Sequence, residues 1–416
     1  MSAPGATLDA AAELLTALVA APSLNPQGEP PARRGPHYGE AQAATVVEAY
    51  ARTLPGAQVV RAAVAEDRWN VLARFAATMC AAGEPKARPA LVFCTHLDTV
   101  GIPPGAEALL TPRRVGERLF GRGACDAKGS LAAMLLAARA LAVAPARGDD
   151  RPAGSEPPLD VVFAFVADEE YGALGARALV GQIPRIAAAL MGEPTSLAVV
   201  AAHRGGAKWR VRTRGRAAHT SRAEAGINAI YAMGRVLQVI AEELPERLAH
   251  LWHPLCGGSA VHATLIQGGR DPNTVPDACT IELNGRLAPG VPLAPAIAEI
   301  NRFLTERAGD LGGAVLEIES PYFTLPGLDT PAGGDFVQAV RAAVVEAGSS
   351  GAIEGRPYGS DAPFLAAGGA PTVLLGPGSE LQAHADDEWI DLGEVCRAAA
   401  IYANLAERAL TGRLTL

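Results

Sequence analysis

The stretch LDVVFAFVADEE, residues 159–170, places three acids directly after a long hydrophobic run. Residues 161–166 are β-branched, aromatic or alanine, which predicts a strand buried on both faces of a mostly parallel sheet. Asp168, Glu169 and Glu170 stand where this strand would end, and in open α/β sheets ligands bind at the carboxyl ends of strands. Adjacent carboxylates repel one another unless a cation or a shared proton compensates. The stretch therefore predicts either a cation site or, as the alternative, a solvated acidic turn.

The composition indicates a globular protein with more than one domain. The 416 residues exceed the length of one ordinary domain. The 44 acidic and 36 basic residues give a net charge of −8, which argues against non-specific nucleic-acid binding. Six cysteines without a CxxC pair indicate reduced thiols. The first residues lack the features of a signal peptide and no apolar run reaches membrane length, so we expect a cytoplasmic protein that binds no membrane.

Periodicity predicts an α/β domain interrupted by a smaller α+β domain. In the larger domain we expect helices at residues 8–21, 39–54, 131–146, 335–347 and 392–410, and strands at 69–75, 90–95, 161–166, 186–191 and 372–375. In the smaller domain we expect strands at 208–213, 259–266, 278–287 and 314–318, with helices at 226–244 and 293–307. The expected larger domain therefore comprises residues 1–202 and 321–416, with helices on both faces of its sheet. The expected insertion comprises residues 203–320. Residues 145–158 indicate a surface loop.

Polar residues at the predicted strand ends and loops of the larger domain form a candidate metal site. They are His96, Asp98, Asp126, the acids 168–170, Glu193 and His384. Imidazoles and carboxylates without a thiolate suit zinc, cobalt or manganese. Two histidines and three carboxylates exceed the ligands of one catalytic zinc and fit two metals with a bridging carboxylate. In the alternative interpretation the histidines are core residues, and the acids cap helices or are solvated.

The segment GRGACD, residues 121–126, superficially resembles a dinucleotide-binding loop. Asp126 takes the place of the third glycine, where it would repel a pyrophosphate, so we reject nucleotide binding there. The sequence also lacks a GxSxG elbow, a Walker loop and an HExxH helix, which removes the commonest serine-hydrolase, P-loop and zincin interpretations.

Eight short motifs together point to a known family. In chain order the sequence contains CTHLDTV, GRGACDAKG, ADEEYGALGA, GEPT, RAAHTSRAEAGINAI, DPNTVP, YGSDAPF and QAHADDEW. This set resembles the di-zinc metallopeptidase family that includes aminoacylase, acetylornithine deacetylase, succinyl-diaminopimelate desuccinylase and glutamate carboxypeptidase. The resemblance implies two divalent metal ions, zinc first and cobalt or manganese as alternatives. It also implies that the larger domain binds the metals and that the insertion is a lid and dimerisation domain.

The resemblance assigns a role to each candidate ligand. His96 and Glu193 would bind one metal, Glu170 and His384 the other, and Asp126 would bridge the two.

The resemblance also assigns residues to the chemistry. Asp98 would accept a hydrogen bond from His96 and orient its ring. The implied reaction is amide hydrolysis by a water held between the metals, with Glu169 as the general base that accepts its proton.

Further implied residues come mainly from the insertion. His219 resembles the family's oxyanion-binding histidine, and Asn273 and Arg286 resemble its substrate-binding residues, with Arg286 suited to a carboxylate. The backbone of Gly359 and Ser360 would add donors to that carboxylate. The family resemblance further implies a homodimer formed through the inserted domain.

We therefore expect a hydrolase that removes the acyl group from a small N-acyl amino acid, of the acetylornithine deacetylase or desuccinylase kind. A dipeptidase or carboxypeptidase would use the same centre, and a non-catalytic binding protein is the third interpretation. The motifs do not identify the acyl group or the side chain, because one methylene in a pocket changes specificity by only about 1–3 kcal/mol.

Overall fold

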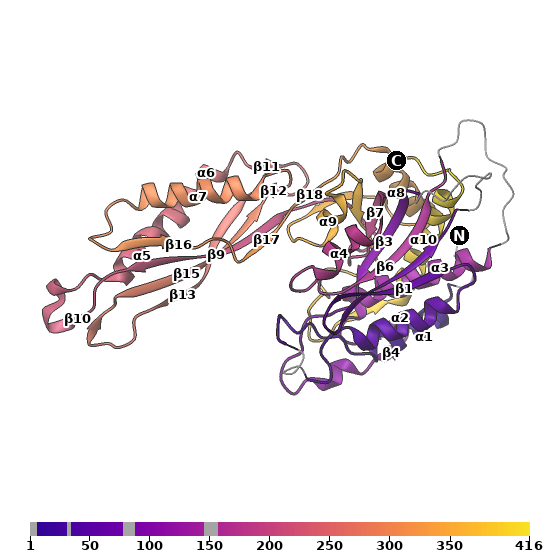
Figure 1. Cartoon of the computed structure of the whole chain (residues 1–416), viewed down its shortest axis with the longest axis horizontal. Coiled ribbons are helices and arrows are strands. Elements are labelled where there is room, and N and C mark those ends of the chain that lie inside the picture. Colours follow the sequence, from indigo (N-terminus) through magenta and orange to yellow (C-terminus); the bar gives the residue numbers. More distant parts are fainter. Residues whose placement is uncertain (1–5, 31–34, 78–87, 145–156) are drawn as a thin grey trace. The chain divides into compact units, whose positions relative to one another are not determined.

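The computed structural model describes residues 6–30, 35–77, 88–144 and 157–416 (Figure 1). The chain divides into two compact units. Unit 1 comprises Met1–Ala201, Thr330–Glu354 and Asp361–Leu416, and unit 2 comprises Ala202–Asp329 and Gly355–Ser360. Residues 145–156 of the expected surface loop lie outside the described residues.

The central sheet of unit 1 has the strand order β1-β2-β6-β3-β7-β20-β8, and β19 also pairs with β8. Its strands are β1 (Gln58–Ala65), β2 (Arg68–Phe75), β3 (Ala90–His96), β6 (Asp160–Val166), β7 (Ile186–Met191), β8 (Val199–His203), β19 (Ile353–Arg356) and β20 (Thr372–Leu374). The four central strands β6, β3, β7 and β20 run parallel, and β2 and β8 join them antiparallel. Every residue of β3 and β6 is buried, so the predicted α/β fold with its parallel central strands is confirmed.

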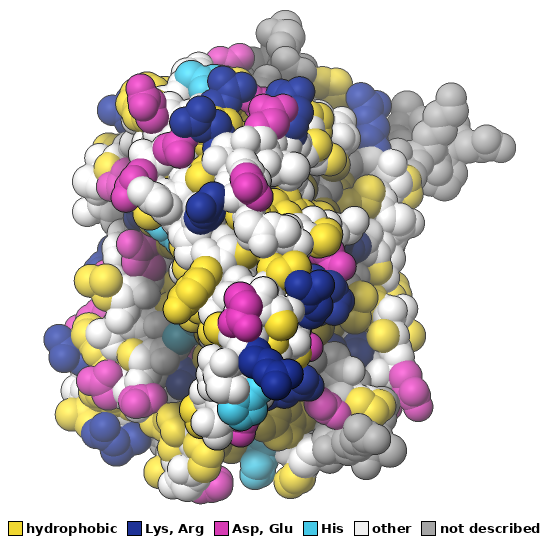
Figure 2. All heavy atoms as spheres, turned by 90° about the vertical axis from the view of Figure 1, so that its left-hand side faces the viewer, with side chains coloured by type: hydrophobic (Ala, Val, Ile, Leu, Met, Phe, Trp, Pro, Cys, Tyr) yellow, Lys and Arg dark blue, Asp and Glu magenta, His cyan; other side chains and the backbone are white. Residues whose placement is uncertain are grey.

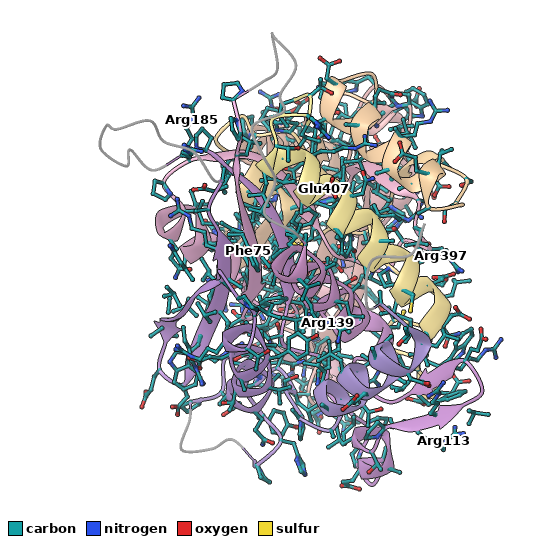
Figure 3. The ribbon with its side chains drawn as sticks, turned by 90° about the vertical axis from the view of Figure 1, so that its right-hand side faces the viewer. Phe75, Arg113, Arg139, Arg185, Arg397 and Glu407 are labelled. Atoms are coloured by element: carbon teal, nitrogen blue, oxygen red, sulfur yellow. The ribbon has the colours of Figure 1, made fainter. Side chains whose placement is uncertain are left out.

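Helices cover both faces of this sheet. They are α1 (Leu8–Val19), α2 (Ala41–Arg52), α3 (Gly129–Val143), α4 (Leu174–Gln182), α8 (Asp335–Glu346), α9 (Ala362–Ala366) and α10 (Leu392–Leu410). In the sheet β3 lies between β6 and β7, so the connection from β3 to β6 and the connection from β6 to β7 run across the sheet in opposite directions. Right-handed crossovers therefore place α3 and α4 on opposite faces. Helix α10 packs on α3, and its outer side carries Arg397 and Glu407 (Figure 3).

A small antiparallel sheet in unit 1 joins two segments that are distant in the sequence. Its strands are β4 (Arg113–Val115), β5 (Arg118–Phe120) and β21 (Trp389–Asp391), in the order β21-β5-β4. Trp389 pairs with Phe120 in register, and the Arg118 guanidinium lies 3.8 Å from the centroid of the Trp389 ring. The sheet thereby holds the chain before residue 121 against the chain after residue 388.

Unit 2 is an antiparallel sheet with helices packed on one face. The sheet has the order β13-β15-β9-β16, and β17 also pairs with β9. The strands are β9 (Gly205–Arg214), β13 (Ala260–Gly268), β15 (Ala278–Leu287), β16 (Val315–Ile318) and β17 (Phe323–Leu325), with short strands β10 (Ala218–His219), β11 (Trp252–His253), β12 (Gly257–Gly258), β14 (Thr274–Val275) and β18 (Leu328–Asp329). The helices are α5 (Ala229–Gln238), α6 (Leu244–Leu248) and α7 (Leu293–Ala308). Alternate residues of β9 and β15, including Trp209 and Leu283, are buried with the apolar faces of these helices.

The bounds of unit 2 extend beyond the expected insertion of residues 203–320. Strand β17 pairs with β9, and β18 pairs with Ala202 and His203 at the start of the unit. Residues 355–360 also belong to it, since Ser360 contacts His203. Among the helices of the described residues, none combines the length and the apolar composition that a membrane span requires.

Candidate metal centre

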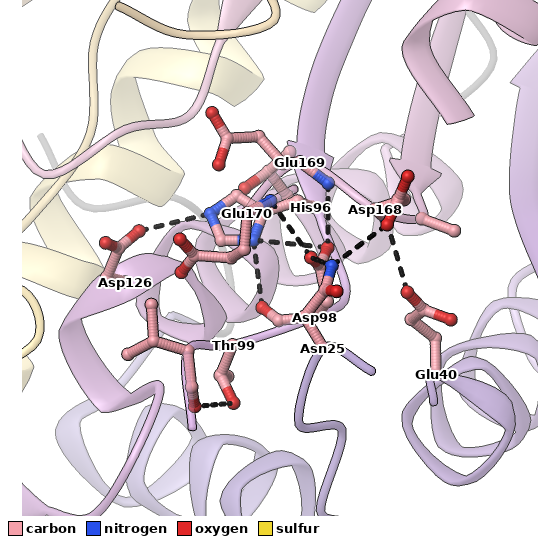
Figure 4. A network of polar contacts seen from close by, with 12 residues as sticks. Asn25, Glu40, His96, Asp98, Thr99, Asp126, Asp168, Glu169 and Glu170 are labelled. Carbon is pink, nitrogen blue, oxygen red and sulfur yellow. Dashed lines mark hydrogen bonds and ion pairs between the residues drawn. The ribbon is translucent and has the colours of Figure 1, made fainter. Parts of the chain in front are cut away.

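The five predicted metal ligands lie at the carboxyl ends of the central strands of unit 1. His96 is the last residue of β3, Glu170 follows β6 and Glu193 follows β7. Asp126 lies in a kinked turn directly before α3, and His384 lies in the loop between β20 and β21. The strands therefore bring together residues from five separate segments, and Figure 4 shows His96, Asp126 and Glu170 of them.

The ligand atoms form two groups that share Asp126. One group is His96, Asp126 and Glu193, the other is Asp126, Glu170 and His384, and within each all ligand atoms lie within 4.8 Å of one another. His96 Nε2 is 3.1 Å from Asp126 Oδ1, and His384 Nε2 is 3.3 Å from Asp126 Oδ2. The two oxygens of Asp126 thus face different histidines, the arrangement of a bridging carboxylate. We call these five residues the open cluster.

Two carboxylate oxygens of the open cluster lack a protein partner. Glu170 Oε1 and Glu193 Oε1 are buried and make no hydrogen bond within the described part of the chain. Burial, reinforced by the charge of Asp126, raises the pKa of Glu193 to about 8 and also raises the pKa of Glu170. Buried carboxylates without partners are costly. A divalent cation would supply the missing partner, and the nitrogen and oxygen donors fit zinc, cobalt or manganese.

Both histidines of the open cluster favour the protonated state in the metal-free chain. Hydrogen bonds to Asp126 and Glu170 raise the pKa of His384 to about 10. Burial opposes protonation of His96, but its hydrogen bond with Asp126 and the nearby Asp98 carboxylate raise its pKa well above the ordinary value. Protons on these rings therefore supply positive charge where a metal would supply it.

Asp98 orients the site through two different groups. We expected its carboxylate to accept the hydrogen bond of the His96 ring, but His96 Nδ1 lies 2.9 Å from the Asp98 carbonyl oxygen and 3.7 Å from its Oδ1. The carboxylate instead accepts hydrogen bonds from the backbone N–H groups of Glu169 and Glu170 and from Asn25 Nδ2. Asp98 therefore positions the histidine by its backbone and the two glutamates by its side chain.

Asp168 belongs to a second buried network, which Asn25 links to Asp98. Its Oδ1 accepts hydrogen bonds from Arg68 Nη2 at 2.9 Å and Asn25 Nδ2 at 3.0 Å. Arg68 also forms a forked ion pair with Glu40. We call Asn25, Glu40, Arg68 and Asp168 the closed network, of which Figure 4 labels Asn25, Glu40 and Asp168. The sequence analysis identified neither Asn25, Glu40 nor Arg68, because they lie on other elements and follow no recognisable spacing.

Glu169 and Glu170 are neighbours with different surroundings. In Figure 4 the carboxylate of Glu170 turns toward Asp126 and that of Glu169 turns away from it. Glu169 offers an oxygen within 4.8 Å of His96 and Glu170 ligand atoms, but it is absent from the two groups that share Asp126. Burial, with the charge of Glu193, raises the pKa of Glu169 well above its usual value. Its surroundings therefore favour a carboxyl group that can hold a proton.

Unit 2 brings His219 and Asn273 together. Strands β10 and β14 pair His219 with Thr274, and the N–H of Thr220 donates to the Asn273 carbonyl at 2.9 Å. His219 Nδ1 accepts the backbone N–H of Ser221 at 3.1 Å, which leaves Nε2 as the N–H donor. The ring is exposed. His219 can therefore donate a hydrogen bond to a ligand.

Arg286 lies elsewhere on the sheet of unit 2, on β15 opposite Gly206 of β9. It is half-buried, and its side chain makes no hydrogen bond or ion pair within the residues that the structure describes. Burial and the charge of Arg204 lower its pKa. An anion would relieve this uncompensated charge.

Gly359 and Ser360 are held in the segment that returns to unit 2. A Cβ atom at Gly359 would lie 2.4 Å from Leu325 Cδ2, so a larger residue there would require the Leu325 side chain to move. Ser360 Oγ lies 3.0 Å from Nε2 of the buried His203, a residue that the sequence analysis did not select. Burial lowers the pKa of His203 to about 4, so it acts as a neutral partner of the serine.

Known proteins resemble this chain in sequence. The model of peptidase family M20/M25/M40 matches residues 92–408. The acetylornithine deacetylase of Myxococcus xanthus is 30% identical over 341 residues, 80% of this chain and 83% of the relative. A probable carboxypeptidase of Aspergillus clavatus is 30% identical over 349 residues, 78% of this chain and 75% of the relative.

Solved structures share the fold. Aminopeptidase PepT from Bacillus cereus has a TM-score of 0.74 at 21% identity and covers 98% of this chain and 99% of its own. A dinuclear metal-binding peptidase of the M20 family from Bacillus subtilis has a TM-score of 0.65 at 18% identity, covering 97% and 99%. The family indicated by the eight motifs is thereby confirmed. The chain belongs to peptidase family M20/M25/M40 and is a metal-dependent hydrolase.

Proposed function

We propose that this enzyme hydrolyses the amide bond of small N-acyl amino acids, in the manner of acetylornithine deacetylase or succinyl-diaminopimelate desuccinylase. The observation that carries the proposal is the pair of ligand groups that share Asp126, with Glu169 beside them. The relative named acetylornithine deacetylase supports the substrate class.

The open cluster holds two divalent metal ions in this proposal, with zinc preferred over cobalt and manganese. His96 and Glu193 would hold one ion, Glu170 and His384 the other, and Asp126 would contribute an oxygen to each. Ions bound there would supply a lower pKa for a water and a polarised amide carbonyl. The carboxylate oxygens without protein partners support this assignment.

Glu169 is the general base in this proposal. It accepts a proton from the attacking water and returns it to the nitrogen of the leaving amine. The Asp98 carboxylate fixes the backbone of Glu169 through the hydrogen bond at 3.2 Å. This contact keeps the base in place while its side chain stays outside the two ligand groups.

Unit 2 recognises the substrate. Nε2 of His219 donates a hydrogen bond to the oxyanion that forms at the amide carbon. Asn273 binds the substrate beside it, and Arg286 with the backbone of Gly359 and Ser360 binds the substrate carboxylate. The exposed His219 ring and the unpaired Arg286 guanidinium support these roles.

The enzyme forms a homodimer through unit 2 in this proposal. Strand β13 is an edge of the sheet, and its Leu265 and Ile266 are 63% and 59% exposed. Exposed edge strands with apolar side chains favour pairing with another chain. Figure 2, which views unit 2 from the end that carries β10, shows further hydrophobic side chains among charged ones. In sedimentation experiments we expect the wild type to be a dimer and the Leu265→Glu variant to be a monomer. A monomeric wild type would contradict the proposal.

The second candidate is a dipeptidase or carboxypeptidase, favoured by the relative named a probable carboxypeptidase. Such substrates also place a carboxylate near the scissile amide, so the same residues would serve.

Amine release from N-acetyl and N-succinyl amino acids and from dipeptides tests the proposal, using chelator-stripped protein with and without zinc or cobalt. We expect metal-dependent release from the N-acyl amino acids. Release from dipeptides alone supports the second candidate. No release from any of them by protein that holds two metals contradicts both and supports a binding protein.

A further inference from the structure

Glu388 is an almost completely buried acid whose two oxygens each accept two hydrogen bonds. It is 2% exposed. Its Oε1 accepts the backbone N–H groups of Cys125 and Asp126 at 2.9 and 3.0 Å. Its Oε2 accepts the N–H of Gly123 at 2.9 Å and Arg122 Nη1 at 2.8 Å. All four donors belong to the segment that carries the bridging Asp126.

This segment has the geometry of an anion-binding turn, and the anion that it binds is the carboxylate of Glu388. Gly121 and Gly123 have φ values of +146° and +82°, which glycine adopts readily. Successive backbone N–H groups in such turns form a concave site for anions. The segment is GRGACD, which superficially resembles a nucleotide-binding loop, and here the N–H groups of Gly123, Cys125 and Asp126 donate to the Glu388 carboxylate.

The same acid is tied to the loop of His384. Arg122 Nη1 donates to the carbonyl of Ala385, the residue after His384, at 3.1 Å as well as to Glu388. The N–H of Gly121 donates to the Glu388 carbonyl at 3.0 Å. Strands β5 and β21 then continue this pairing away from the site. Glu388 and Arg122 therefore connect the loops of Asp126 and His384.

We propose that Glu388 is a positioning residue for the metal pair, which sets the placement of the bridging Asp126 directly and of His384 through Arg122. This inference rests on the metal ligands named under the proposed function. Hydrogen bonds that orient ligands commonly change metal affinity by about 10- to 100-fold. All four hydrogen bonds of the Glu388 carboxylate come from the segment that carries Asp126. We therefore expect loss of Glu388 to weaken metal binding more than substrate binding.

The Glu388→Gln variant removes the charge and keeps the shape. A glutamine offers one oxygen and one NH2 group, and each carboxylate oxygen faces two donors here. In either orientation of the amide, its NH2 group, which is a donor, therefore faces two N–H donors. We expect cobalt titration of metal-stripped protein to show about 10- to 100-fold weaker binding of the ions and a changed visible absorption spectrum of bound cobalt.

Asp160→Asn is the matched control. Asp160 is also 2% exposed and accepts hydrogen bonds from an arginine, Arg74, and from a backbone N–H, that of Ala77. It begins β6, whereas the metal ligands lie beyond the other end of that strand. We expect this variant to lower the unfolding temperature while it binds cobalt with wild-type affinity and spectrum.

Arg122→Met removes the link to Ala385 together with one of the four donors to Glu388, and it decides the question where Glu388→Gln does not fold. It leaves the backbone donors of the turn in place and cuts the link to Ala385, so we expect weaker binding of one cobalt ion only. Wild-type affinity and spectrum in both variants overturn the inference. Wild-type protein that binds no cobalt contradicts the proposed metal centre instead.

Discussion

Asp168 and Glu170 follow the same strand, two residues apart, yet they belong to opposite kinds of site. Asp168 is in the closed network, where Arg68 and Asn25 both donate to its carboxylate. Glu170 is in the open cluster, where one buried oxygen has no partner within the described residues. Asp168 thus receives hydrogen bonds from groups of the chain, whereas the unpartnered oxygen of Glu170 is available to the cation that we propose.

The same contrast separates the arginines of unit 2. Arg212 and Arg214 on β9 form ion pairs with Glu319 and Glu317. Arg286, on the adjacent strand β15, has no such partner in the described part of the chain. The unpaired arginine is accordingly the one proposed to bind the substrate.

The largest expected effect comes from Glu169→Gln. The variant keeps the shape of the side chain but cannot accept a proton, so we expect kcat to fall about 10²- to 10⁴-fold. Metal content, measured by plasma mass spectrometry, should stay at the wild-type value because Glu169 lies outside the two groups that share Asp126. Wild-type turnover in this variant would remove Glu169 from the mechanism.

Glu170→Gln and Asp168→Asn compare the open cluster with the closed network directly. We expect Glu170→Gln to lose one bound metal, since a neutral amide replaces a ligand. We expect Asp168→Asn to keep both metals and to lose about 1–3 kcal/mol of unfolding free energy, because Arg68 loses a charged partner. Metal analysis and urea denaturation measure the two effects. Equal loss of metal in both variants would contradict the proposed difference between the open cluster and the closed network.

Arg286→Ala and Arg212→Ala make the corresponding comparison in unit 2. A hydrogen-bonded carboxylate–arginine contact is worth about 1.5–3 kcal/mol, so we expect the KM of Arg286→Ala to rise about 10- to 100-fold. The exposed pair of Arg212 should contribute little, leaving KM near the wild-type value. Steady-state kinetics on the substrate found in the panel measures both, and equal KM values would exclude Arg286 from recognition.

A separate prediction concerns the stability of the metal-free protein, which should change with pH. The folded-state pKa of Glu193, about 8, lies above the ordinary glutamate value of about 4.3. The folded state therefore holds this proton more tightly, and the stability that it contributes is lost as pH rises from about 4.3 through 8. Glu193→Gln, which resembles the protonated acid, should match the metal-free wild type at about pH 4, near the unfolded pKa, and melt at a higher temperature at pH 7. A wild type that is the more stable at pH 7 would contradict this.

Several elements could be predicted closely because their patterns are local. Strands β7 and β15 and helix α10 have the bounds that the periodicity predicted. Strand β1 and helix α4 were not predicted. The first is half-exposed along its length and the second has few buried residues, so neither shows a strong hydrophobic period.

The sequence by itself determined the family, the parallel central strands and the candidate ligands at their ends, because strand patterns and donor chemistry are written in short contiguous motifs. Only the tertiary structure decided which acids are paired. Asp168 meets Arg68 from β2 and Glu40 from the start of α2, and Glu388 meets the backbone of a distant turn. Pairing of this kind depends on contacts between separate elements, which local spacing does not encode.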